Sequence, residues 1–243
     1  MKDNFSTQAK AYAQYRPYYP PEMIAYIVSL VHDKDAALDV ATGNGQVAAA
    51  LSPYFKEVYG TDISAKQLQN AKTAPNVVYK EGSAEDTGFN NEQFNLVTVA
   101  QAIHWFKFDA FYAEVKRILK PDGLFAVMGY GLFSTNPETD VIINHFYKDI
   151  IGSYWDSERK YIDENYTTIP FPFKEIEAKK FTNNFTWTFE QLTGYLETWS
   201  AVQHYIKQKG SNPVDLIREE LQSSWEKSDK QVMFPILLRI GKI

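Results

Sequence analysis

The 243-residue sequence contains no cysteine and only four histidines. The absence of cysteine excludes disulfide bonds, thiolate metal sites and a cysteine nucleophile. Four histidines are too few for a histidine-rich metal cluster, so we expect no metal cofactor. The chain also lacks a P-loop and a Gly-x-Ser-x-Gly motif. These two absences argue against a P-loop nucleotide hydrolase and a serine hydrolase.

Long apolar runs and an excess of positive charge are also missing. No segment approaches the run of about 18 apolar residues that crosses a membrane. Residues 1–6 carry an acid and amides where a signal peptide needs an apolar run. The formal net charge of −5 argues against a nucleic-acid partner, because phosphate binding needs a basic surface. We therefore expect a cytoplasmic protein that binds neither membranes nor nucleic acids; nothing in the sequence indicates its oligomeric state.

Aromatic residues, in contrast, make up 15% of the chain. They are compatible either with large rings in the core or with an aromatic-walled ligand site. Hydrophobic residues at 44% and charged residues at 23% are typical of a globular protein. The length suits one large domain, or one domain with a cap.

The first half of the chain alternates short apolar runs with helical patterns. The runs are rich in β-branched residues and bounded by turn residues, which is typical of buried strands. They cover residues 37–41, 57–61, 76–80, 94–100 and 124–128. Strands that alternate with helices predict right-handed crossovers and a mostly parallel sheet covered on both faces.

The pattern changes after Tyr130. Residues 132–170 are aromatic and helix-like in places, 175–181 resemble a strand, and 189–207 and 214–227 resemble helices. A closing strand is expected at 236–240, beginning after Pro235 or bulging there. We predict one domain over 1–243, with a core of 34–131, 172–182 and 232–243. Cap elements are expected at 1–33, 132–171 and 186–230.

The most informative segment is residues 39–48. Gly43 and Gly45 follow the first predicted strand, where glycine lets the backbone turn and approach a ligand closely. The next helix presents free N–H groups to an anion. Asp62 ends the second strand, and a carboxylate there can accept both ribose hydroxyls of a nucleoside. The alternative to a nucleoside site is that Gly43 and Gly45 only form a turn and Asp62 only caps a helix.

More than one function is compatible with such a nucleoside site. Gly43-x-Gly45-x-x-Ala48 also matches the dinucleotide fingerprint, with Asp62 near the ribose acid of NAD enzymes. An NAD(P)-dependent oxidoreductase and a non-catalytic nucleoside-binding regulator are therefore alternatives.

The surrounding sequence resembles the class I S-adenosylmethionine-dependent methyltransferases. "LDVATGNG" is similar to their first motif: Asp39 matches its acid, and Gly43 and Gly45 match two of its glycines. Ala41 replaces the first glycine, a change that is tolerable if its φ stays negative. "GTDIS", "EGSAEDTGF", "FNLVTVAQAIHWF" and "EVKRILKPDGLFAV" resemble the later motifs, over about 34–130. "AYAQYRPYYPPEMI" and "HWF" resemble the methyltransferase type 11 branch that includes trans-aconitate methyltransferase.

This resemblance implies an α/β fold, a doubly wound, Rossmann-like and mostly parallel sheet. Seven strands are expected, the last antiparallel, with a helical cap inserted after the fifth. It also implies S-adenosylmethionine as cofactor and a small-molecule methyl acceptor, with a carboxylate among the candidates. The implied cofactor-binding residues are Asp39, Ala41, Gly43, Asn44, Gly45, Asp62, Ile63, Ser83, Ala84, Glu85 and Gln101.

His104 is the candidate catalytic base, because it follows the fourth strand and a histidine titrates near neutrality. The alternative is a histidine that packs beside Trp105. Arg16 suits a carboxylate of the cofactor or of an acidic substrate, unless it is a surface arginine before Pro17. The expected substrate-binding residues are Tyr12, Tyr15, Arg16, Trp105 and Trp199.

Overall fold

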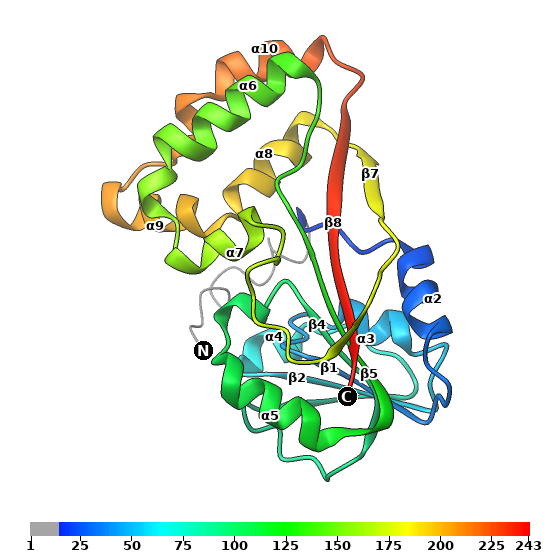
Figure 1. The fold of residues 1–243 in the computed structure, drawn as a ribbon. Coiled ribbons are helices and arrows are strands. Elements are labelled where there is room, and N and C mark those ends of the chain that lie inside the picture. Colours follow the sequence, from blue (N-terminus) through cyan, green and yellow to red (C-terminus); the bar gives the residue numbers. More distant parts are fainter. Residues whose placement is uncertain (1–14) are drawn as a thin grey trace.

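An eight-stranded sheet organises residues 15–243, the part of the chain that the computed structural model describes (Figure 1). Its strands are β1 (Ala36–Val40), β2 (Glu57–Asp62), β3 (Val77–Glu81), β4 (Phe94–Ala100), β5 (Leu119–Tyr130), β6 (Lys174–Ile176), β7 (Thr182–Thr186) and β8 (Gln231–Lys242). The order is β3-β2-β1-β4-β5-β8-β6, and β7 also pairs with β8. β1 to β5 pair in parallel, whereas β8 is antiparallel to its neighbours. The predicted Rossmann-like fold class is confirmed.

The strand count differs from the predicted seven. Two short strands, β6 and β7, replace the single strand expected at 175–181, and both pair with different parts of β8. β8 also begins before Pro235, at Gln231. The N of Gly131 donates to the O of Pro235 at 3.1 Å, so the missing N–H of Pro235 faces Gly131, beyond the end of β5. The proline therefore interrupts the ladder only where β5 stops.

The helices fall into two groups (Figure 1). α2 (Pro21–Ser29), α3 (Gln46–Leu51), α4 (Ala65–Gln69) and α5 (Phe108–Ile118) flank the sheet. α6 (Pro137–His145), α7 (Lys160–Asp163), α8 (Phe189–Glu197), α9 (Ser200–Lys209) and α10 (Arg218–Glu226) form the helical cap. Crossovers on both sides explain why the strands of the sheet's centre are buried on both faces.

One predicted boundary needs correction. Residues 1–33 were expected among the cap elements, but the α2 side chains of Met23 and Ile27 pack with Val47 and Leu51 of α3 on one face of the sheet. The apolar residues of α2 recur at helical spacing, and the sheet face is the apolar surface that they bury. α2 therefore belongs with the sheet. On the opposite face, Phe111 of α5 lies in a separate apolar cluster.

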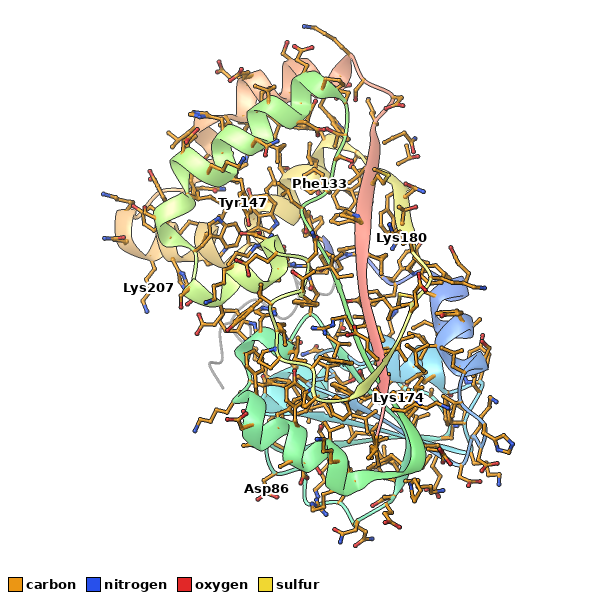
Figure 2. The ribbon with its side chains drawn as sticks, in the orientation of Figure 1. Asp86, Phe133, Tyr147, Lys174, Lys180 and Lys207 are labelled. Carbon is orange, nitrogen blue, oxygen red and sulfur yellow. The ribbon has the colours of Figure 1, made fainter. Side chains whose placement is uncertain are left out.

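The cap has a hydrophobic core of its own. Leu192, Leu221 and Trp225 of its helices are fully buried in one cluster with Phe234 of β8. Figure 2 shows the side chains of Phe133 and Tyr147 within the cap, while Lys207 points outward. β8 runs from this cap down into the sheet and so belongs to both parts (Figure 1).

The single helix expected at 189–207 is two helices. α8 begins with a capping box, in which the Thr188 Oγ1 accepts from the N of Gln191 and the Gln191 Oε1 accepts from the N of Thr188. It ends at Glu197, and α9 starts at Ser200. At this break, the carbonyl oxygen of Thr198 accepts a hydrogen bond from Arg16.

Candidate functional site

The turn after β1 contains several residues in the left-handed region. Gly43 and Gly45 have φ values of 55° and 73°. Ala41 has φ 54°, so the condition of a negative φ, under which alanine would be tolerable there, is not met. Gln101, at the end of the neighbouring β4, has φ 53°. Each of these two non-glycine conformations costs on the order of 1 kcal/mol, and both lie where the direction of strand order reverses, the usual ligand crevice of such sheets.

Space around the turn explains why Gly45 has no side chain. A Cβ on Gly45 would lie 2.1 Å from the hydroxyl oxygen of Tyr79, whose hydroxyl donates to the O of Lys72 at 2.6 Å. A Cβ on Gly43 would meet no atom within 4 Å, so its positive φ is the constraint there. The backbone at Gly43 is consequently open to a ligand.

Asp39 braces this turn from within the core. Its carboxylate accepts from the Thr42 Oγ1 at 2.6 Å and from the Thr98 Oγ1 at 2.8 Å. The side chain is 1% exposed, and burial raises the pKa of Asp39 to about 6 despite these two hydrogen bonds. The acid of the predicted motif therefore links the turn to β4.

Asp62 lies in direct contact with the turn. Its Oδ2 accepts from the N of Gly43 at 2.9 Å, and its Oδ1 accepts from the N of Ser64 at 2.9 Å. The structure thus brings together the two features that define the predicted nucleoside site. Each carboxylate oxygen has more than one acceptor position, so these contacts leave capacity for a ligand hydroxyl. Ile63 lies between Asp62 and Ser64 along the same edge.

The turn after β3 lies beside Asp62, because the N of Gly82 donates to the O of Asp62 at 3.0 Å. There the Glu85 carboxylate accepts from the Ser83 Oγ at 2.5 Å and from the N of Lys107 at 3.1 Å. Burial raises the pKa of Glu85, but these hydrogen bonds outweigh it and hold the pKa below its usual value. Ala84 is buried in the same turn.

A cavity of about 480 Å³ lies against the turn after β1; we name it the loop cavity. Its wall includes Asp39, Ala41, Gly43, Asn44 and Gln101 among the expected cofactor residues. The rest of the wall comprises Arg16, Pro17, Tyr19, Thr42, Gln46, Val47, Ala100 and Tyr130. Of the expected residues, Gly45, Asp62, Ile63, Ser83, Ala84 and Glu85 lie outside this wall.

A second cavity, of about 460 Å³, lies between the sheet and the cap; we name it the cap cavity. It is lined by Arg16, Gln101, His104, Trp105, Trp155, Asp156, Arg159, Ile162, Trp199 and Ser200. Arg16 and Gln101 line both cavities, which are therefore neighbours.

Arg16 joins the two parts of the molecule. Its Nη1 donates to the Tyr130 hydroxyl at 3.2 Å, and its Nη2 donates to the O of Thr198 at 3.0 Å, at the break between α8 and α9. Its guanidinium also lies 5.3 Å from the ring centroid of Tyr195. Arg16 is therefore part of the site rather than a surface residue before Pro17.

His104 lines the cap cavity but differs from the expectation in one respect. The side chain is buried, and its Nδ1 lies 3.3 Å from the Tyr166 hydroxyl. Burial, together with the positive charge of Arg159, lowers the pKa of His104 to about 3. The expectation that His104 titrates near neutrality is wrong, and the ring is neutral at physiological pH.

Arg159 is one of the residues of the cap cavity that the sequence did not reveal. Its Nε donates to the Tyr147 hydroxyl at 2.7 Å and to the Asp163 Oδ1 at 3.2 Å, and its guanidinium lies 4.6 Å from the ring centroid of Trp155. Within residues 15–243, its two Nη atoms have no hydrogen-bond partner. In the sequence, Arg159 belongs to a charged stretch that is typical of a solvated surface.

The remaining expected residues divide between site and packing. Trp105 and Trp199 line the cap cavity. Tyr15 lines neither cavity, because its ring packs against Gly194 of α8, where a Cβ would lie 2.7 Å from it. Tyr12 lies outside the described residues.

Within residues 15–243, no group of three or more His, Asp or Glu side chains is arranged to hold a metal ion. None of the helices in this part of the chain has the length and apolar character needed to cross a bilayer.

Comparison with known proteins places this geometry in context. The family profile "Methyltransferase domain" matches residues 38–127. A Dictyostelium discoideum protein named as a methyltransferase is 32% identical, over 99% of this chain and 95% of its own. A Saccharomyces cerevisiae protein whose name includes "S-adenosylmethionine-dependent methyltransferase" is 25% identical, over 96% and 93%. A solved structure from Anaeromyxobacter dehalogenans, named as a type II methyltransferase, has 33% identity and a TM-score of 0.86, covering 94% of this chain and 98% of that one.

Proposed function

Since this chain belongs to the class I S-adenosylmethionine-dependent methyltransferases, we propose that it methylates a small carboxylate-bearing acceptor held in the cap cavity. Family membership decides against the NAD(P)-dependent oxidoreductase and the non-catalytic regulator. The acceptor, its binding residues and the carboxylate chemistry are the proposal.

The loop cavity fits the cofactor. The open backbone at Gly43 and the contact from Gly43 to Asp62 suit an adenosyl group at this edge of the sheet. Arg16, in the same wall, suits the carboxylate of the methionine part. S-adenosylmethionine, when bound, supplies a methyl group on a positively charged sulfonium.

The observation that carries the proposal is the shared wall of the two cavities. Arg16 and Gln101 separate a cavity suited to the cofactor from one that the cap closes. Direct methyl transfer needs the acceptor atom next to the methyl carbon and in line with the bond that breaks. The cap cavity is the neighbouring space in which a small acceptor would meet that condition.

The charges in the cap cavity favour an acidic acceptor. Arg159 contributes a guanidinium to its wall, beside the carboxylate of Asp156 and a neutral His104, while Arg16 is assigned to the carboxylate of the cofactor. The guanidinium of Arg159 is held by Tyr147 and Asp163 through its Nε, which leaves the planar Nη pair for a carboxylate. Burial is the main cause of the low pKa of His104; the charge of Arg159 lowers it further, and the charge of Glu158 opposes this effect.

A carboxylate also suits the chemistry of the site. It is already ionised at neutral pH, so it needs no base, and a neutral His104 is then no obstacle. Transfer of the methyl cation from a sulfonium to a carboxylate removes both charges, which a buried, water-poor cavity favours.

The test measures S-adenosylhomocysteine formation with small carboxylic acids and with their uncharged amides. We expect turnover with acids alone and a methyl ester as product. Arg159→Gln should raise the KM for the acid at least about tenfold, the scale of one charged hydrogen-bonded pair, without changing the Kd for S-adenosylhomocysteine.

Arg218→Gln is the matched control. Arg218 lies on the outer surface of the cap, where it pairs with Asp215 and Glu197. Its loss should leave the KM unchanged. Faster turnover of the amides than of the acids, or an unaltered KM for Arg159→Gln, would contradict a carboxylate acceptor.

A further inference from the structure

Tyr166 connects two residues of the cap cavity without lining it. The side chain is fully buried, and its hydroxyl lies 3.1 Å from the Gln101 Oε1 and 3.3 Å from the His104 Nδ1. Tyr166 itself is held in place by Arg239, whose Nη1 donates to its carbonyl at 2.9 Å. The orientation of the Gln101 amide determines which atom donates in each hydrogen bond of the series from Gln101 through Tyr166 to His104.

The amide of Gln101 has one possible orientation. Its Nε2 donates to the O of Tyr130 at 3.2 Å, and its Oε1 accepts from the N of Tyr130 at 3.3 Å. Exchange of the two amide atoms would set a donor against a donor and an acceptor against an acceptor. The atom of Gln101 that faces Tyr166 is therefore the oxygen, which can only accept.

The proton positions follow in order. The single hydroxyl proton of Tyr166 points to the Gln101 Oε1, so the Tyr166 oxygen can only accept from the His104 Nδ1. The Nδ1 of His104 then carries the ring proton. In a neutral imidazole the other nitrogen, Nε2, is left with a lone pair.

The His104 Nε2 keeps some accessible surface although the residue is buried. Within residues 15–243, the His104 Nε2 has no hydrogen-bond partner, and it is not among the fully buried side-chain atoms that lack one. His104 lines the cap cavity, which is the open space available to it. A polar atom in this position is satisfied when a bound molecule donates to it.

We propose that Tyr166 is a positioning residue that holds neutral His104 as the Nδ1–H form, so that Nε2 accepts a hydrogen bond from a hydroxyl or N–H group of the acceptor. The acceptor is then a small acid with a second, hydrogen-donating group, a definition that rests on the proposed function. In this proposal, Arg159 binds the carboxylate of the acceptor. His104 accepts from the hydroxyl or N–H group of the acceptor and so fixes the orientation of the acceptor.

The tautomer is measured in the whole protein by 15N NMR of labelled histidine, with the His104 signals assigned by their loss in His104→Gln. We expect an unprotonated Nε2 and a protonated Nδ1 in the wild type. Tyr166→Phe retains the buried ring and removes the hydroxyl, and should shift the population toward the Nε2–H form that dominates free histidine in water. A wild-type Nε2 that is protonated, or a tautomer that Tyr166→Phe leaves unchanged, would overturn the proposal.

Tyr112→Phe is the matched control. It also removes a buried tyrosine hydroxyl, which donates to the O of Pro170, but Tyr112 makes no contact with His104. Its His104 signals should match those of the wild type. If Tyr112→Phe changes the tautomer as much as Tyr166→Phe does, the effect is a general loosening and the positioning role is rejected.

The contact with the acceptor is tested with malate and succinate, two acids that differ by one hydroxyl. With S-adenosylhomocysteine present, malate should move the His104 Nε2 resonance, while succinate should not. Equal responses, or none to either acid, would reject the hydrogen bond to Nε2. The tautomer result is independent of turnover: a confirmed tautomer without methylation of any acid would refute the proposed function alone, and ester formation with an Nε2–H histidine would refute only this inference.

Discussion

At the residue scale, Asp62 supports the backbone of the turn and belongs to the proposed cofactor site. Its carboxylate accepts from the N–H groups of Gly43 and Ser64, so Asp62→Ala removes support for the turn together with the proposed contacts to the ribose. We predict that affinity for S-adenosylmethionine falls by about 1–3 kcal/mol, or ~5- to 150-fold, measured by calorimetry.

The control for Asp62 is Glu81→Ala. Glu81 pairs with Asp62 between β2 and β3, yet its side chain is exposed. Its replacement should leave the affinity within about twofold. An unchanged affinity in Asp62→Ala would remove this carboxylate from the cofactor site.

Asp39 should make stability depend on pH. Burial raises its pKa in the folded protein to about 6, above the value in an unfolded chain, so the folded state binds more protons between about pH 4 and 6. The stability that Asp39 contributes is thus complete below about pH 4 and is lost as the pH rises through 6. Asp39→Asn cannot ionise, so its free energy of unfolding should rise relative to the wild type over that window.

Urea denaturation of both proteins at several pH values between 4 and 7 measures this difference. The pKa of His104, lowered by burial, makes stability fall toward acid pH in both proteins, so it cancels in the comparison. Parallel stability curves would show that Asp39 is not protonated in this range.

The residues of the proposed cofactor site could be predicted from the sequence, whereas Arg159 of the cap cavity could not. Gly43 and Asp62 follow strands that periodicity predicts, and the carboxyl ends of parallel strands meet at one edge, so their contact could be anticipated. Arg159 could not, because its place depends on Tyr147 and Trp155. Packing against these two rings, rather than a local sequence pattern, places that charge at the cap cavity.

At the element scale, α8 depends on its capping box. Thr188→Ala removes the side-chain oxygen that accepts from the N of Gln191 at 3.1 Å. We predict a loss of about 1 kcal/mol in the free energy of unfolding, measured in urea. Thr188→Ser keeps the oxygen and should keep most of the stability; equal losses in both variants would assign the effect to the methyl group instead.

Element boundaries show where sequence patterns are weak. Strands β1 to β4 were predicted to within a few residues, because each is a short run rich in β-branched residues that ends at a polar turn, although only β1 and β4 are buried almost throughout. The region of β6 and β7 was predicted as one strand, since its two short pieces are set by which part of β8 each meets. Pairing between distant segments has no local signal.

At the scale of the whole molecule, we expect Trp199 to stabilise the cap more than the sheet. It is 2% exposed, and its ring centroid lies 5.6–6.3 Å from those of Tyr147, Trp155 and Phe133. We predict that Trp199→Ala lowers stability by about 3–5 kcal/mol. Hydrogen exchange should quicken in α8 and α9 while β1 and β4 remain protected, because the cap has a separate core.

Val141→Ala is the control for Trp199. Val141 lies in the cap helix α6 but is 70% exposed, so its truncation should change neither quantity. If Trp199→Ala altered only the KM for the acceptor, without a change in stability, the ring would be a binding residue rather than part of the cap core.

The sequence predicts the fold class well and the acceptor site poorly. The strand–helix alternation of residues 36–130 allows few topologies, since crossovers between parallel strands are right-handed. The cap cavity, in contrast, is built by Arg16, His104 and Arg159, from three separate regions of the chain. Their meeting depends on how the cap sits on the sheet.

The place of β8 in the chain affects how the protein is made. Ribosomes synthesise residues 231–242 after every other described element, yet β5, β6 and β7 all await this strand as their partner. Until it leaves the exit tunnel, β5 presents an unpaired edge and the cap lacks Phe234. During synthesis, the sheet and the cap therefore both stay incomplete until β8 is added. Chaperone binding during this time would protect the nascent chain from aggregation.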